Sequence, residues 1–177
     1  MNLLETILGA QNGGAVNEIA RQFGLNDGQV KDVIGQLAPA LGRGLQENSR
    51  STGGLEALTK ALSQGNHSRY VEDPSVLRSS EATADGNGIL GHILGSKEVS
   101  RELAGRAANN TGVDSNIIKK ILPMVAALAM GGLSKQANAN PSGGNQITDM
   151  LGSLLDSDGD GSAFDDLIGM AGKFLGR

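Results

Sequence analysis

The residues best placed for metal chemistry form an acidic run near the end of the chain. Carboxylates alternate with small residues over positions 156–162, and a glycine stands sixth, as at the start of a calcium loop. Oxygen ligands at this spacing converge on a hard divalent cation. The predicted calcium ligands are Asp156, Asp158, Asp160 and Asp166. Because Leu167 stands where a closing glutamate is expected, a solvated loop with Ser162 as a helix N-cap is the alternative.

The rest of the chain offers little for catalysis. It contains no cysteine and two histidines, His67 in a polar stretch and His92 among apolar residues. Neither histidine has a second histidine or a cysteine at metal-ligand spacing, and the glycines form no phosphate-binding pattern after a predicted strand. We therefore interpret His92 as structural. We expect no enzymatic activity, no catalytic residues and no cofactor, with calcium kept as a hypothesis.

A second pattern could bind nucleic acid. The small residue, turn glycine and apolar residue of a helix-turn-helix corner occur twice, as Ala20, Gly24 and Val30, and as Ala108, Gly112 and Ile118. The predicted exposed face of the first corner carries Lys31 against Asp27 and Asp32, although Lys119 and Lys120 suit the second corner better. Phosphate contacts require several basic side chains. Nucleic-acid binding is therefore the alternative function and not the preferred one.

These corners belong to an internal repeat. Residues 24–45 align without a gap on residues 112–133, and the apolar positions of one segment meet apolar positions of the other. The spacing of these positions is typical of one buried helical face. The sequence therefore predicts an all-α, multihelical protein with internally duplicated helical units.

The predicted elements divide the chain into five parts. Helices are expected over 2–8, 15–23, 26–47, 54–62, 88–94, 98–109 and 114–133, the last of them central and buried. Proline, glycine and polar residues predict connections between them. The expected parts are a first helical unit at 1–65, a connection at 66–87 with one helical turn, a second unit at 88–135, a linker at 136–144, and a C-terminal helical hairpin with the acidic loop at 145–177.

The C-terminal hairpin is the predicted interaction region. Its two short helices each present an aliphatic face: Met150, Leu151, Leu154 and Leu155, and then Leu167, Ile168, Phe174 and Leu175. Such a face exposed on a monomer would exceed what soluble proteins usually tolerate. We expect the face to dock on the chain's own bundle or on a second copy of the chain, with a homo-oligomer as the favoured partner. The alternative is closure of the hairpin on itself, which would bury much of the face without a second chain.

Composition limits the location and partners of the protein. The net charge is −4, and the surplus acidity lies in residues 141–177. The longest uncharged apolar run, 121–133, is shorter than the roughly 20 residues of a membrane helix, and no targeting segment is recognisable. We expect a cytoplasmic protein without a membrane contact.

Two strings, GILGHILGSKEV at 88–99 and LLDSDGDGS at 154–162, resemble the bacterial YidB-like proteins, as does the repeated helical pattern. The resemblance implies a multihelical bacterial fold. Because that family is a domain of unknown function, it implies no activity and no functional residues. From the residues themselves we predict a structural or protein-interaction module that self-associates.

Overall fold

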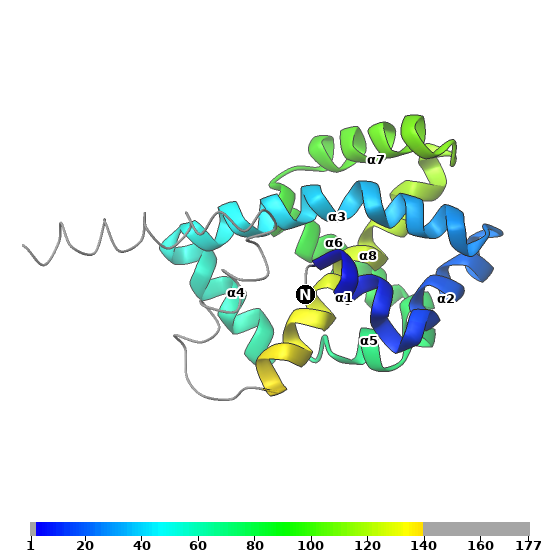
Figure 1. Cartoon of the computed structure of the whole chain (residues 1–177). Helices are drawn as coiled ribbons and strands as arrows, with labels where there is room; N and C mark the ends of the chain where they lie inside the picture. The colour runs from blue at the N-terminus through cyan, green and yellow to red at the C-terminus, as the bar shows by residue number, and fades with distance from the viewer. Residues whose placement is uncertain (1–2, 140–177) are drawn as a thin grey trace, which may run out of the picture.

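The structure is a computed structural model that describes residues 3–139, apart from the side chains of Thr52, Leu55, Ser63 and Gln64. Within this range the chain forms helices and no strand (Figure 1), which confirms the predicted all-α, multihelical fold. The elements are α1 (Leu3–Gly9), η1 (Ala10–Gly13), α2 (Gly14–Phe23), α3 (Asp27–Arg50), α4 (Thr52–Gln64), α5 (Arg69–Glu72), η2 (Pro74–Arg78), α6 (Ser80–Leu94), α7 (Lys97–Thr111) and α8 (Ser115–Ala139).

Helix α8 is the centre of the bundle, as its apolar sequence predicts. Every residue from Ile121 to Ser134 is buried, and α1, α3, α4, α5, α6 and α7 all pack against this helix. Its length and composition would also suit a membrane span, but 83% of the relevant window is buried inside the protein. This burial by other parts of the same chain is typical of a core helix.

The two predicted corners have the same local geometry. Helix α2 ends at Gly24 and α7 ends at Gly112, with φ values of 65° and 73°. These left-handed conformations favour glycine, and each glycine N–H donates to a carbonyl four residues earlier, that of Ala20 and that of Ala108. The long helices α3 and α8 then begin at aligned positions. A common origin of the two units stays a prediction.

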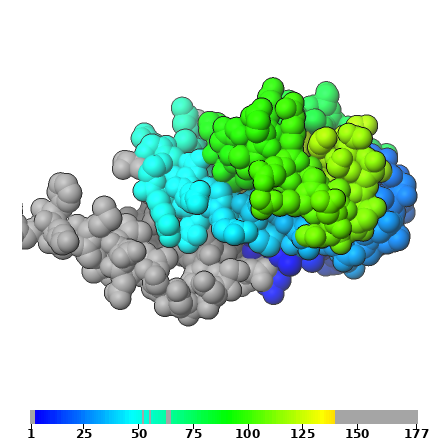
Figure 2. Space-filling view, turned by 90° about the horizontal axis from the view of Figure 1, so that it is seen from above, coloured from blue at the N-terminus to red at the C-terminus, as the bar shows by residue number. Residues whose placement is uncertain are grey.

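The two corners differ in how they are packed. Helix α3 buries one face, whereas α8 is buried on all sides along its middle. Helix α7 covers α3 from outside, and its own Ala104 and Ala107 are fully buried. Figure 2 views the molecule from this side. The Asn110 side chain donates a 2.8 Å hydrogen bond to Oε1 of Gln36 on α3.

The stretch 66–87 differs from the expected connection. It contains α5, η2 and the first half of α6, which begins at Ser80 and not at Gly88. The Ser79 hydroxyl caps this helix by accepting from the Ala82 N–H, and Tyr70 and Leu77 are completely buried. The polar composition predicted a loop, but packing against α8 makes these residues helical.

The predicted linker needs a correction at its start. Helix α8 continues to Ala139, so residues 136–139 are helical and not part of a linker. The remainder of that linker and the C-terminal hairpin at 145–177 lie outside the described residues. The division of the chain into five parts therefore stays a prediction.

Candidate functional site

The predicted calcium ligands and the predicted interaction residues all lie beyond Ala139. Asp156, Asp158, Asp160 and Asp166 belong to this group, as do the aliphatic residues from Met150 to Leu175. Calcium binding and association through these side chains stay predictions. Between Leu3 and Ala139, no group of three or more histidine, aspartate or glutamate side chains could hold a metal ion.

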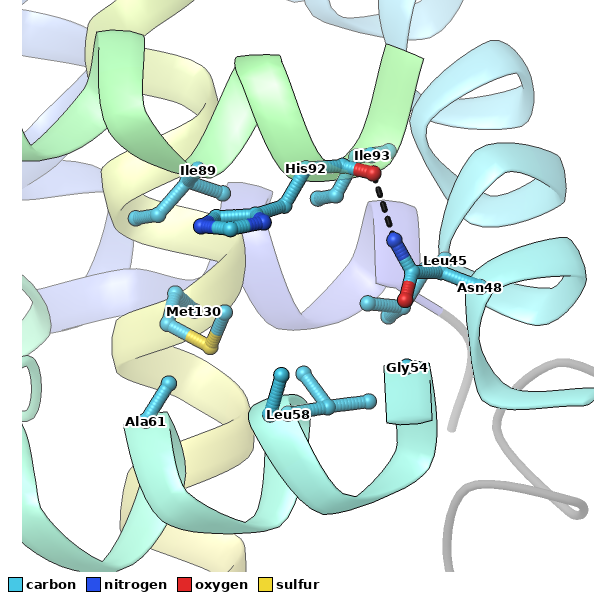
Figure 3. A pocket seen from close by; sticks show the side chains of 10 residues that line it. Leu45, Asn48, Gly54, Leu58, Ala61, Ile89, His92, Ile93 and Met130 are labelled. Carbon is cyan, nitrogen blue, oxygen red and sulfur yellow. Dashed lines mark hydrogen bonds between the residues drawn. The ribbon is translucent and has the colours of Figure 1, made fainter. Parts of the chain in front are cut away.

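An apolar groove lies where α3, α4, α6 and α8 meet. Its volume is about 90 Å³, and its lining includes Leu45 of α3, Leu58 and Ala61 of α4, Ile89 of α6 and Met130 of α8. Figure 3 shows these side chains around the cavity. Small-molecule sites usually enclose roughly 300–1,000 Å³. The groove is therefore better suited to one or two aliphatic side chains than to a cofactor.

A sharp corner between α3 and α4 forms one wall of the groove. Ser51 ends α3 and caps α4, since its hydroxyl accepts from the Gly54 N–H at 3.1 Å. Helix α4 then extends back to α8 (Figure 1). It presents Ala57 and Ala61 to the groove, and these short side chains leave the space unfilled. Longer side chains at these two positions of α4 would extend into the groove.

A hydrogen bond joins the opposite walls. The Asn48 side chain, at the end of α3, donates to the backbone carbonyl of His92 on α6 (Figure 3). His92 itself is exposed and lines the groove. Its apolar sequence context predicts a structural role, whereas the structure places it at the rim of the groove and not in the core.

A polar cluster connects α5 to the first half of α6. The hydroxyl of the buried Tyr70 donates to Oδ2 of Asp85 and accepts a 2.8 Å hydrogen bond from Arg69. Arg69 also forms ion pairs with Glu81 at 2.9 Å and with Asp85 at 3.3 Å. Each charged group has an opposite partner, so the cluster acts as a structural brace between these elements.

Burial shifts the pKa of two groups, Tyr70 within this polar cluster and His67 close to it in the sequence. It raises the pKa of Tyr70 above its usual value, and the hydrogen bond to Asp85 adds to this effect. Burial lowers the pKa of His67, whose Nδ1 atom is buried without a hydrogen-bond partner. Tyr70 is therefore a neutral donor at physiological pH, and His67 favours its neutral form.

The first corner shows no surplus of basic side chains on its outer surface. Lys31 and Asp32 are exposed, whereas Gln36 is bonded to α7. Lys119 and Lys120 are also exposed on α8. The described residues therefore keep the charge balance that made nucleic-acid binding the less favoured alternative.

Sequence reasoning missed both the groove and the polar cluster. Four separate elements contribute to the groove, and no short motif connects them. For the cluster one signal was present: Tyr70 is the only tyrosine of the chain, and a lone aromatic residue in a polar stretch is often buried. The acidic members of the cluster, Glu81 and Asp85, are four residues apart and therefore lie on one face of α6.

Comparison with known proteins gives one match. The family model described as "Bacterial protein of unknown function (DUF937)" matches residues 5–136. No curated protein and no solved structure matches the chain. All the residues that line the groove lie inside the matched range, whereas the C-terminal aliphatic segments lie beyond it.

Proposed function

We propose that this chain, which belongs to the DUF937 family of bacterial proteins of unknown function, is a protein-interaction module that self-associates. Its groove between α3, α4, α6 and α8 would bind an aliphatic helical segment. A second copy of the chain would supply such a segment from its C-terminal region. We also propose that it acts in the cytoplasm and without catalysis.

The apolar groove is the observation that supports this proposal. Leu58, Ile89 and Met130 are buried in the isolated chain, but the neighbouring Ala57 and His92 are exposed. A site with an apolar floor and an accessible rim is the usual arrangement for binding an amphipathic helix. Nucleic-acid binding stays the alternative: Lys119 and Lys120 are exposed on α8, but on the first corner Asp32 balances Lys31.

Light scattering on the full chain tests the proposal. We expect a mass that rises with concentration above that of one chain. The variant Ala57→Glu places a carboxylate at the rim without touching the core, and we expect it to weaken association at least about tenfold, or about 1.4 kcal/mol. Asn17→Glu adds the same charge on the exposed face of α2 and serves as the control.

Two outcomes would contradict the proposal. A monomeric mass at every concentration would exclude self-association. Equal association of Ala57→Glu and Asn17→Glu would show that the groove is not the contact surface. Thermal unfolding of both variants checks that neither substitution disturbs the fold.

A further inference from the structure

The end of α8 lies close to the groove. Helix α4, which forms one wall, packs on α8, and the end of α4 approaches the end of α8 (Figure 1). Met130 lies on the groove floor nine residues before Ala139, the last residue of the helix. At the rise of an α-helix this is a distance of roughly 14 Å. The chain therefore leaves the bundle within reach of the groove.

The residues that follow α8 can span the distance back to the groove. Seven residues, 140–146, separate the end of α8 from the first aliphatic segment. Fully extended, they would span up to roughly 23 Å, which exceeds the distance back to Met130. Their Asn, Pro, Ser and Gly composition is typical of a linker. Residues 147–155 can therefore reach the groove of the chain to which they belong.

The first aliphatic segment fits the groove better than the second. Residues 147–155 contain isoleucine, methionine and leucine at helical spacing and no aromatic side chain. The second segment carries Phe174, a bulkier group for a cavity of about 90 Å³. It is also separated from the first by the acidic run at 156–166. The shorter connection gives the first segment the higher effective concentration.

We propose that residues 147–155 occupy the groove of their own chain as an amphipathic helix, so that a free chain is closed by its own C-terminal segment. This inference rests on the proposed function, because it names the occupant of the same groove. A second copy, or any other partner, must displace the segment before it binds. Exchange of the segment between two copies would produce a dimer by domain swapping.

Engineered disulfides test this closure. Because the chain has no native cysteine, every disulfide must form between the introduced cysteines. Ala57→Cys, at the exposed rim, is combined with Thr148→Cys in the full chain. On a helical wheel Thr148 borders the aliphatic face, whereas Asp149 lies on the opposite face. The matched control pairs are therefore Ala57→Cys with Asp149→Cys, and Asn17→Cys on α2 with Thr148→Cys.

We expect the pair at 57 and 148 to form a disulfide within one chain, in dilute protein, about ten times faster than either control, a preference of about 1.4 kcal/mol. Gel mobility without reductant separates bonds within a chain from bonds between chains. A disulfide requires Cα atoms within roughly 7 Å of each other. If residues 147–155 had no defined position in the groove, cysteines at 148 and 149 would meet the cysteine at 57 equally often and would react with it at equal rates.

Each of the other results overturns the inference. Equal rates for the three pairs would mean that the segment has no defined position in the groove. A disulfide found only between two chains would exclude closure but support the proposed self-association. No disulfide in any pair, at any protein concentration, would contradict both the closure and the use of the groove by this segment.

Discussion

Helices α6 and α8 meet in two different ways. Near the start of their contact, Gly86 is buried against the backbone of Pro123, and a side chain there would overlap the Pro123 carbonyl. Further along, Ile89 and Met130 border the groove, where α4 contributes Leu58 and the short side chains of Ala57 and Ala61. One end of the interface is closed and the other is open. The comparison separates the residues that stabilise the bundle from those that leave a surface for binding.

Adding a methyl group at the closed end should have the largest effect. We expect Gly86→Ala to lower the free energy of unfolding by about 1–3 kcal/mol, because the added Cβ would overlap backbone atoms of Pro123, which shift less easily than a flexible side chain. At this chain length that corresponds to roughly 2–4 °C in Tm for each kcal/mol. Gly88→Ala is the control, since a Cβ there would meet nothing within 4 Å. Equal Tm values for the two variants would contradict a closed end.

The polar cluster should also support the closed end. Tyr70→Phe removes the hydroxyl that bridges Arg69 and Asp85, the residue that precedes Gly86. We expect a loss of about 1–2 kcal/mol in urea unfolding. Glu81→Gln changes the most exposed member of the cluster, with 65% side-chain exposure, and should cost no more than about 0.5 kcal/mol. If the free energy of unfolding falls by the same amount in both variants, the buried Tyr70 hydroxyl does not stabilise the fold more than the exposed Glu81 carboxylate does.

A larger side chain at the open end should raise the free energy of unfolding, whereas one at the closed end lowers it. Ala61→Leu extends a side chain into the groove, and we expect it to stabilise the chain by up to about 1 kcal/mol through burial of apolar surface. The same variant should weaken self-association, since the space is then filled. Thermal unfolding and light scattering on one sample measure both effects. Destabilisation comparable to that of Gly86→Ala would show that the helices of the bundle leave no space beside Ala61.

The smallest expected effect is a pH dependence of the bundle near α5. The pKa of His67 in the folded chain lies below its usual value of 6.5 because of burial, so the unfolded chain binds more protons there. This contribution to stability is present above pH 6.5 and is lost as the pH falls through the folded pKa. Nearby Asp85 opposes the shift and Arg69 adds to it. In His67→Gln, urea unfolding below pH 6.5 should depend less on pH, and an unchanged dependence would rule out His67 as its source.

Much of the fold could be predicted from the residues that end and begin helices. Gly24 and Gly112 marked two corners, and Asn26 marked the start of α3, where it forms a capping box with Gln29. The first half of α6 could not be predicted, because Gly86 and four small polar residues of low helix propensity outnumber its good helix formers, Glu81, Ala82 and Ala84. It is helical because Gly86 permits a close contact with α8, which depends on residues far away in the sequence.

The candidate site was much less predictable. The aliphatic pattern of the C-terminal segments indicated an interaction, but not the surface that receives them. That surface depends on the angle between α3 and α4 and on the short side chains of Ala57 and Ala61. His92 was noticed for its sequence context, yet its position at the rim follows from the packing of α6 on α3 and α8.

The central claim is that the groove is a binding surface filled by an aliphatic segment, and the methyl NMR signal of Met130 tests it most directly. Met130 lies on the groove floor, whereas Met124 is buried in α8 away from the groove. In the full chain we expect the double variant Leu151→Asp, Leu154→Asp to shift the Met130 methyl signal and to leave that of Met124 unchanged. Identical Met130 signals with and without these substitutions would show that the segment does not occupy the groove, in its own chain or in a second copy.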